Sequence, residues 1–237
     1  MTFLLSNDDG IDAPGIAALA TALKHLDRLG QTSQMVVAPD RQYSGCGHQV
    51  TVDRPIAVTQ RDSHHYAVSG TPADCIRLAL SQFCPKPSWI LSGINAGGNL
   101  GVDAYISGTI AAVREGAMQG IPGIAISQYH DRQKPWDWEQ STQLTTRVLA
   151  KLLEWGCDPG TFWNVNLPHL ADQQEGKTLE QAIPDLVMCA ASTSPLPVNY
   201  RQTPDGYWYY GDYQSREALA GTDVATCFAG NIAIVRM

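Results

Sequence analysis

Short apolar runs alternate with amphipathic stretches along the first two-thirds of this chain. The apolar runs have the length and β-branched content of buried strands, and the stretches between them repeat apolar residues at helical spacing. The predicted strands cover residues 3–6, 35–38, 89–92, 123–127 and 162–165, and the predicted helices cover about 14–29, 71–83, 107–118 and 136–155. Extended pieces are also predicted around residues 50–58 and 66–68. This alternation predicts an α/β fold with a Rossmann-like, mostly parallel sheet and helices on both of its faces.

The pattern changes after about residue 181, where short β-like pieces replace the alternation. These pieces are predicted at residues 186–189, 207–210 and 232–235. We therefore predict a catalytic core over residues 1–181 and a β-rich extension over residues 182–237. The aromatic cluster Tyr207-Trp208-Tyr209-Tyr210 fits either a protruding hairpin that binds another subunit or an ordinary packed β-extension. In either case we expect the last predicted strand to be the closing strand of the extension.

Size and charge narrow the possible partners. A chain of 237 residues that is 44% hydrophobic can bury a full core. The formal net charge of -7 argues against a protein that holds long nucleic acid. No apolar stretch approaches the roughly 20 residues that span a bilayer. The six cysteines are scattered, and the chain starts directly with a strand, so we expect reduced thiols in a cytoplasmic protein.

Two adjacent carboxylates, Asp8 and Asp9, follow the first predicted strand. Polar clusters also follow the next two strands: Asp40-Arg41 with Ser44, and then Asn95. Because the carboxyl ends of parallel strands meet at one edge of a sheet, we expect these side chains to converge. Carboxylate, hydroxyl and amide oxygens suit a hard cation such as Mg²⁺ or Mn²⁺ better than a structural zinc. Taken alone, the two acids are also typical of a solvated turn in which one caps the next helix.

A glycine-rich loop over residues 93–101 follows the third strand, and Ser107-Gly108-Thr109 opens the next helix. Free backbone N–H groups at a helix start, two hydroxyls and a glycine that permits close approach form a suitable seat for phosphate. The same residues are also ordinary capping chemistry. Likewise, the Gly97-Gly98-Asn99 segment can be a tight turn or part of a binding site.

Several blocks, taken in their order along the chain, resemble the SurE family of stationary-phase survival phosphatases. They are Leu4-Leu5-Ser6-Asn7-Asp8-Asp9-Gly10, Ala13-Pro14-Gly15, Val37-Ala38-Pro39-Asp40-Arg41, Ser44-Gly45, Gly70-Thr71-Pro72-Ala73-Asp74-Cys75, Ser92-Gly93-Ile94-Asn95-Ala96-Gly97, Asn99-Leu100-Gly101 and Ser107-Gly108-Thr109. Later segments, Asn164-Val165-Asn166-Leu167-Pro168 and Gly221-Thr222-Asp223-Val224, also resemble the family.

This resemblance implies a metal-dependent phosphomonoesterase that hydrolyses nucleoside 5′- or 3′-monophosphates to nucleoside and phosphate. Some members also hydrolyse short polyphosphate. The family's metal ligands match Asp8, Asp9, Ser44 and Asn95, and its cofactor is one divalent cation such as Mg²⁺ or Mn²⁺. A Rossmann-like core and a C-terminal arm used in oligomers are also implied, so we expect a homodimer or a homotetramer.

The predicted mechanism assigns the remaining residues. Asp8 and Asp9 hold the metal, whose bound water attacks phosphorus. The phosphate is held by a set of four residues, Asn99, Ser107, Gly108 and Thr109. Asp40 or His48 is a candidate for proton transfer, although His48 is also compatible with a loop imidazole that has no role. Val102, Ile106, Cys46 and His48 depart from the residue types expected near the pocket, which concerns substrate preference and rate.

Other chemistries fit the sequence less well. An aspartate nucleophile would need a second acid two positions on, whereas Asp8 and Asp9 are adjacent. The chain has no GxSxG elbow for a serine hydrolase, and acids replace GxGxxG after the first strand. The alternative left open is a catalytically silent nucleotide-binding or regulatory protein that keeps the fold and the metal site.

Overall fold

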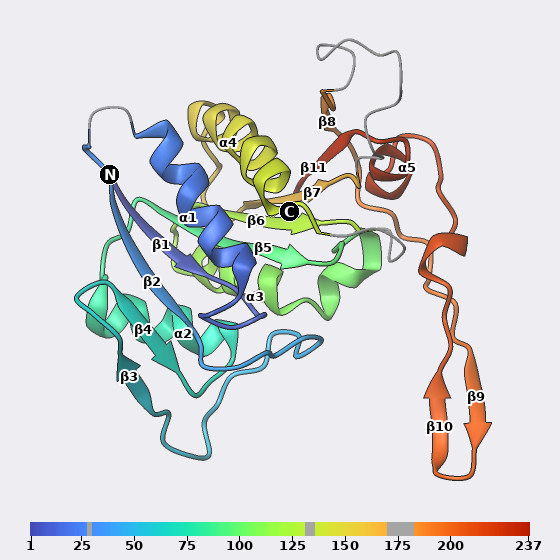
Figure 1. Cartoon of the computed structure of the whole chain (residues 1–237), viewed down its shortest axis with the longest axis horizontal. Helices are drawn as coiled ribbons and strands as arrows, with labels where there is room; N and C mark the ends of the chain where they lie inside the picture. The colour runs from blue at the N-terminus through green and yellow to red at the C-terminus, as the bar shows by residue number, and fades with distance from the viewer. Residues whose placement is uncertain (28–29, 131–135, 170–182) are drawn as a thin grey trace.

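A sheet of nine strands forms the centre of the computed structural model, which describes residues 1–27, 30–130, 136–169 and 183–237 (Figure 1). In spatial order the strands are β3 (Val58–Gln60), β4 (His65–Val68), β2 (Ser33–Pro39), β1 (Thr2–Ser6), β5 (Trp89–Ala96), β6 (Gly123–Gln128), β7 (Phe162–Leu167), β11 (Ile232–Arg236) and β8 (Leu186–Met188). The six strands from β4 to β7 are parallel, while β3 and β11 run antiparallel to their neighbours β4 and β7. The predicted mostly parallel α/β sheet is confirmed.

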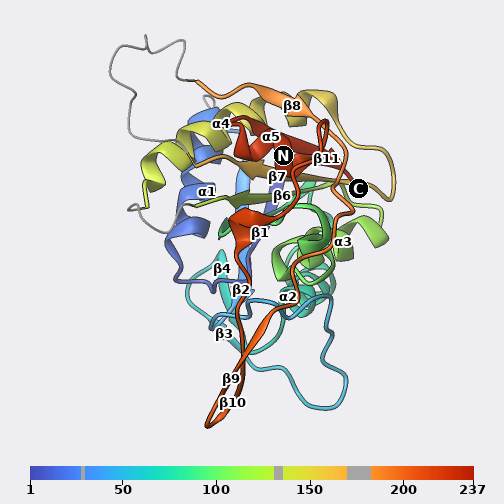
Figure 2. The same ribbon diagram turned by 90° about the vertical axis from the view of Figure 1, so that its right-hand side faces the viewer.

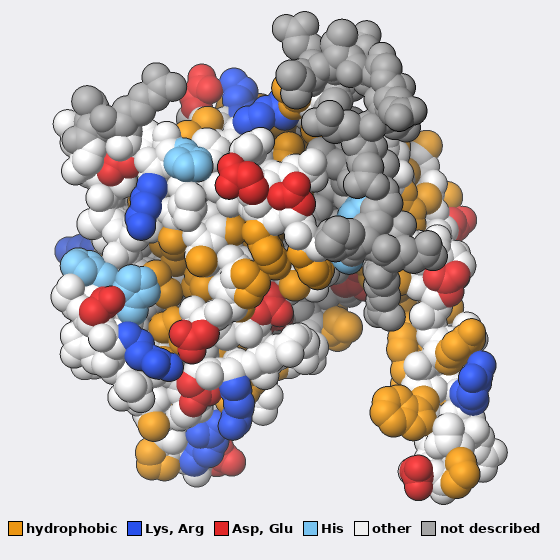
Figure 3. All heavy atoms as spheres, in the orientation of Figure 1, with side chains coloured by type: hydrophobic (Ala, Val, Ile, Leu, Met, Phe, Trp, Pro, Cys, Tyr) orange, Lys and Arg blue, Asp and Glu red, His pale blue; other side chains and the backbone are white. Residues whose placement is uncertain are grey.

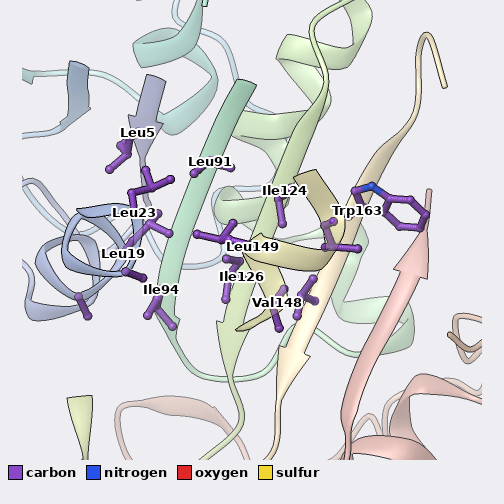
Figure 4. Packing of buried hydrophobic residues seen from close by; sticks show 14 of the residues in the cluster. Leu5, Leu19, Leu23, Leu91, Ile94, Ile124, Ile126, Val148, Leu149 and Trp163 are labelled. Carbon is purple, nitrogen blue, oxygen red and sulfur yellow. The ribbon is translucent and has the colours of Figure 1, made fainter. Parts of the chain in front are cut away.

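Helices cover both faces of the sheet (Figure 2). Helices α1 (Pro14–Leu26) and α4 (Trp138–Trp155) pack on one face, and α2 (Pro72–Leu78) and α3 (Gly108–Met118) pack on the other. Successive strand residues point to opposite faces, so Leu5 belongs to the first core and Leu4 to the second. Figure 4 shows the first core, where side chains of α1 and α4 meet those of the central strands.

Side-chain hydrogen bonds cap the starts of α2 and α3. Thr71 and Asp74 form a reciprocal capping box at the start of α2, and the Ser107 hydroxyl accepts a hydrogen bond from the Ile110 amide at the start of α3. A π-helical turn, Ala79–Phe83, continues α2 to the predicted end. Local chemistry therefore accounts for where these helices begin.

Two predicted segments differ from the structure. Strand β5 continues through Gly93, Ile94 and Asn95, which we predicted to be loop, because the β-sheet pairing with β6 resumes after an irregularity. In the predicted extended piece over residues 50–58, the described strand begins only at Val58. Asn95 consequently lies on the end of a strand, which holds it more firmly than a free loop would.

The C-terminal region divides between the main sheet and a separate hairpin. Strands β8 and β11 join the nine-stranded sheet, and a short helix, α5 (Asp223–Phe228), precedes β11. Strands β9 (Tyr200–Thr203) and β10 (Gly206–Tyr209) form a two-stranded hairpin that projects away from the body (Figure 1). The predicted domain boundary at residue 181 lies outside the described residues and stays a prediction. Among the described helices, none has the length and apolar character needed to cross a membrane.

Candidate functional site

The turn after β1 presents the two predicted metal-binding acids. Asn7 shapes this turn: its side-chain amide donates to the Gly10 carbonyl at 2.7 Å, and its side-chain oxygen accepts from the Gly10 amide at 3.2 Å. Gly10 has a positive φ of 106°, which a residue with a side chain rarely adopts. The turn thus holds Asp8 and Asp9 in place beyond the carboxyl end of a buried strand.

Asp8 is a buried carboxylate with one close partner. It is 4% exposed, and the Thr109 hydroxyl donates to its Oδ1 at 2.5 Å. Burial raises the pKa of the Asp8 carboxyl to about 6, the Thr109 hydrogen bond lowers it, and the neighbouring Asp9 charge raises it. The local environment therefore disfavours the charge that Asp8 carries at neutral pH.

Gly108 lets the start of α3 approach this acid. A Cβ atom at position 108 would lie 2.8 Å from the Asp8 Cβ, 3.0 Å from its Oδ2 and 3.0 Å from the Cys46 sulfur. These distances are too short for a side chain, so glycine is needed for this approach. The amino end of α3, which carries a partial positive charge, thus lies against Asp8.

Asp9 is tied to the end of β5, where Asn95 lies. Its Oδ2 accepts a hydrogen bond from the Ala96 amide at 3.0 Å. The Asn95 side-chain nitrogen donates to the Gly97 carbonyl at 2.7 Å, so the Asn95 side-chain oxygen is the atom left for a cation. Two of the predicted ligands, which are 86 positions apart in the sequence, therefore lie at the same sheet edge.

The loop after β2 reaches the same edge through its backbone. The Tyr43 amide donates to the Asp8 carbonyl at 2.7 Å, which places Ser44 one residue from this contact. Ser44 is exposed, and its hydroxyl accepts from the Gln42 side chain at 2.8 Å. No hydrogen bond joins Ser44 to either carboxylate in the described chain, and a shared ion would not require one.

The electrostatics of the pair suit a divalent cation. No Lys, Arg or His side chain of the described residues forms an ion pair with Asp8 or Asp9. Within the same residues no three His, Cys, Asp or Glu side chains gather as a metal cluster, so the acids would need Ser44 and Asn95 as further oxygen donors. Two adjacent, uncompensated carboxylates and two neutral oxygens fit a hard cation.

The predicted phosphate-binding residues divide into two groups. Ser107, Gly108 and Thr109 begin α3 beside Asp8, but the Thr109 hydroxyl proton is already donated to that acid. Asn99 is 7% exposed, and its side-chain nitrogen donates to the Ser127 hydroxyl at 2.8 Å. The structure therefore gives Thr109 and Asn99 hydrogen-bonding roles within the protein that we did not predict.

Two asparagines of β7 support the glycine-rich loop, and sequence reasoning gave them no role. Asn164 and Asn166 each donate to the Asn99 carbonyl, at 3.0 and 3.1 Å, and Asn166 also accepts from the Asn99 amide at 2.7 Å. Their spacing of two in a buried strand places both on one face. Paired amides at this spacing inside an apolar strand were the signal that could have identified them.

The two candidates for proton transfer, Asp40 and His48, lie in different surroundings. Asp40 lines a cavity of about 430 Å³ together with Asp9 and Asp12, whereas His48 is held by Glu115 at 2.9 Å. Burial raises the pKa of the Cys46 thiol to about 11, so this thiol stays neutral beside Asp8. Asp40 thus shares a cavity with one of the two acids, whereas the His48 ring is already engaged by Glu115.

Comparison with known proteins gives consistent results. The family model described as "Survival protein SurE" matches residues 3–186. A protein of Nostoc sp. named "Putative 5'-nucleotidase" is 53% identical over 237 residues, covering 100% of this chain and 99% of its own length. The "5'-nucleotidase SurE" of Xanthomonas oryzae pv. oryzae is 36% identical over 235 residues, with 99% of this chain and 88% of that protein covered.

A solved structure agrees with the same assignment. The crystal structure of the SurE protein from Aquifex aeolicus superposes with a TM-score of 0.82 at 33% sequence identity, and it covers 100% of this chain and 93% of that one. The family model covers far more than half of the chain, and the two relatives are 53% and 36% identical to it over nearly its whole length. The resemblance seen in the sequence motifs is thus confirmed: this chain belongs to the SurE family.

Proposed function

We propose that this chain is a metal-dependent phosphomonoesterase that hydrolyses nucleoside 5′-monophosphates to nucleoside and phosphate. The observation that carries the proposal is the buried carboxylate of Asp8, which lies between Asp9 and the start of α3 without a cationic partner in the described chain. The relatives named as 5′-nucleotidases support the same reaction. Nucleoside 3′-monophosphates and short polyphosphate are proposed as further substrates.

The proposed metal ligands are Asp8, Asp9, Ser44 and Asn95, and the proposed ion is Mg²⁺ or Mn²⁺. When bound, such an ion would offset charge on the phosphoryl group and lower the pKa of a coordinated water. Thr109 orients Asp8 through its 2.5 Å hydrogen bond, and the Ala96 amide orients Asp9. These hydrogen bonds thus fix both carboxylates, which would hold the ion.

Phosphate binding is proposed at the start of α3. Ser107 caps this 11-residue helix by accepting from Ile110, and its hydroxyl proton stays available to a phosphate oxygen. The amides of Gly108 and Thr109 belong to the first turn, where intrahelical partners are lacking. Asn99 would contribute through the position of its loop, and Asp40 is the preferred candidate for proton transfer.

Phosphate release from a panel of nucleoside monophosphates tests this function. The folded protein is assayed with Mg²⁺ or Mn²⁺, then with an excess of chelator, and then with the metal restored. We expect release that stops with the chelator and returns with the metal. Binding of nucleotides without metal-dependent release from any of them would instead support the catalytically silent protein.

The projecting β9–β10 hairpin is proposed to join two or four copies of the chain. Its aromatic side chains are exposed: Tyr200 by 62%, Tyr207 by 70% and Trp208 by 69%. Figure 3 shows apolar side chains along this hairpin, far from the body of the protein. Exposed aromatic residues at such density are typical of a protein interface.

Replacing Tyr207 and Trp208 by serine is expected to shift the protein towards monomers. Buried interface aromatics contribute about 2 kcal/mol or more each, so losing one of them raises the dissociation constant about 30-fold, and losing both should raise it up to about 1,000-fold. Sedimentation velocity at several concentrations measures this change. Val52→Ser, which removes an apolar side chain that is 89% exposed elsewhere, is the control. An unchanged sedimentation profile in the double variant would rule out the hairpin as the interface.

The proposed location is the cytoplasm. All six cysteines are free, three of them buried. Free thiols persist in reducing compartments, whereas oxidising compartments favour disulfides. This observation supports the cytoplasmic location that we predicted from the sequence.

A further inference from the structure

The segment that carries Ser44 has no regular structure of its own to hold it in place. This segment, residues 40–57, joins β2 to β3, and although every residue in it is described, none lies in a helix or a strand. Gly45 and Gly47 have positive φ values of 71° and 59°, and glycine adds conformational freedom that the fold must restrain. The position of the segment therefore depends on contacts with the rest of the protein.

One of these contacts is a pair between His48 and Glu115. The His48 Nε2 lies 2.9 Å from a carboxylate oxygen of Glu115. Because an ionised carboxylate only accepts hydrogen bonds, Nε2 is the ring nitrogen that carries the hydrogen and donates it. Glu115 is 3% exposed inside α3, although glutamate is rarely buried unless it is paired. Its other partner is Arg77 at 3.4 Å, whose side chain is 55% exposed.

Hydrogen bonds bracket Ser44 on both sides. Before it, the Tyr43 amide donates to the Asp8 carbonyl at 2.7 Å, and after it, the Gly47 amide donates to the Ile106 carbonyl at 2.9 Å. The side-chain pair with α3 follows directly after the second of these bonds. The short stretch that carries Ser44 is thus held between the end of β1 and helix α3.

The rest of the segment is anchored independently, at the start of α2. The Thr71 hydroxyl donates to the Gln49 carbonyl at 2.6 Å, and the Thr51 hydroxyl and amide donate to the Asp74 carboxylate at 2.7 and 2.9 Å. Loss of the His48 pair should therefore leave the protein folded and loosen the stretch before residue 48. A local effect on the candidate site can thus be distinguished from a general loss of stability.

We infer that Glu115 and His48 are positioning residues, whose pair lets α3 set the place of the Ser44 hydroxyl relative to the two carboxylates. This inference rests on the proposed metal site and deepens it. Glu115 lies eight residues along α3 from Ser107, about 12 Å at 1.5 Å per residue, so one rigid helix places both the phosphate seat and the Ser44 stretch. The role of His48 is then to hold the segment and not to transfer a proton.

Calorimetric titration of the metal-free protein with Mn²⁺ tests the inference without turnover. For His48→Ala we expect the dissociation constant to rise about 10- to 100-fold, the usual effect of removing a group that orients a metal ligand. His48→Gln should restore most of the affinity and of kcat, because its side-chain amide can donate to the same carboxylate. Arg77→Met is the matched control: it removes the other partner of Glu115 without touching the segment, so the affinity should stay unchanged.

Hydrogen exchange of the metal-free protein, followed by mass spectrometry, measures the hold on the segment itself. In His48→Ala, exchange of the amides of residues 43–47 should be about 10- to 100-fold faster, because a hydrogen bond to a charged group no longer opposes local opening. Arg77→Met and His48→Gln should exchange as the unaltered protein does.

The outcomes separate this inference from the proposed function. Unchanged exchange in His48→Ala, or faster exchange with unchanged Mn²⁺ affinity, would overturn the positioning role. Loss of kcat in His48→Gln with its Mn²⁺ affinity retained would also overturn it, and would assign proton transfer to the imidazole. If the unaltered protein neither bound Mn²⁺ nor released phosphate, the proposed function would fail, whereas faster exchange in His48→Ala would still support the pair as the group that places the segment.

Discussion

Asp8→Asn is expected to abolish metal-dependent phosphate release and to leave a folded protein that is, without metal, more stable than the wild type. The asparagine side-chain oxygen can still accept the Thr109 hydrogen bond, and the Tyr43 amide binds only the backbone of residue 8. The fold should therefore persist. Loss of activity together with a gain in stability is characteristic of a charged group retained for function and not for folding.

The loss of activity should be large. Removing a partner that merely orients a metal ligand typically lowers affinity or activity 10- to 100-fold, so losing the charged ligand itself should lower kcat/KM at least about 100-fold. Metal titration measures the loss of metal affinity, and phosphate release measures the loss of activity. Asp12→Asn serves as the control, because Asp12 lines the neighbouring cavity but has a side chain that is 81% exposed. Full activity in Asp8→Asn would show that the site is misplaced.

The gain in stability follows from the raised pKa of Asp8. Burial raises this pKa from 3.8 to about 6, so between these pH values the folded protein binds more protons than the unfolded chain. The stability that the protonated Asp8 carboxyl contributes to the fold is fully present below about pH 4 and is lost as the pH rises through about 6. At pH 7 the loss amounts to about 3 kcal/mol, since one pKa unit corresponds to 1.36 kcal/mol.

Thermal melting in chelator, from pH 4 to pH 8, measures this difference. The melting temperature of Asp8→Asn should exceed that of the wild type by up to about 10 °C at pH 7, and the gap should close towards pH 4. Saturating Mg²⁺ or Mn²⁺ should reverse the order, because an ion that binds only the folded wild type stabilises it. A gap that stayed constant with pH would contradict the assignment to this carboxyl.

Most of the core could be predicted from the sequence because its elements are specified locally. Apolar runs such as 3–6 and 123–127 are too short for helices and are flanked by turn residues, and Thr71 and Ser107 mark helix starts by their own hydrogen bonds. The convergence of Asp9 and Asn95 followed from the geometry of parallel strands. These predictions needed no knowledge of distant contacts.

The remaining features depend on contacts that the local pattern does not encode. Helix α5 has only six residues, too few for a periodic signal, and its buried Asp223 binds the Gly101 amide 122 positions away. Strand β5 continues past Gly93 because Asn95 and Ala96 still pair with the end of β6. Thr109 was predicted to bind phosphate, and only the approach of α3 to β1 shows that its hydroxyl binds Asp8.

The same dependence on distant contacts appears where the hairpin joins the body. Arg216 and Asp103 form a buried ion pair with two hydrogen bonds, at 2.8 and 3.1 Å. Burial raises the pKa of the Tyr213 hydroxyl, which stays protonated and donates to Asp103 at 2.8 Å. Asp103 also accepts from the Leu100 amide at 3.2 Å. This cluster fixes the base of the hairpin to the segment that follows the glycine-rich loop.

Arg216→Met should therefore lower the free energy of unfolding by about 3–5 kcal/mol, because it leaves the Asp103 charge buried without its partner. Urea denaturation measures the loss, which should correspond to roughly 6–20 °C in melting temperature. Arg236→Met is the matched control: its pair with Asp158 is exposed, so its loss should cost at most about 1 kcal/mol. Combining Arg216→Met with Asp103→Leu should restore part of the stability, since neither charge then remains buried. Equal losses for Arg216→Met and Arg236→Met would show that the buried pair does not hold the hairpin to the core.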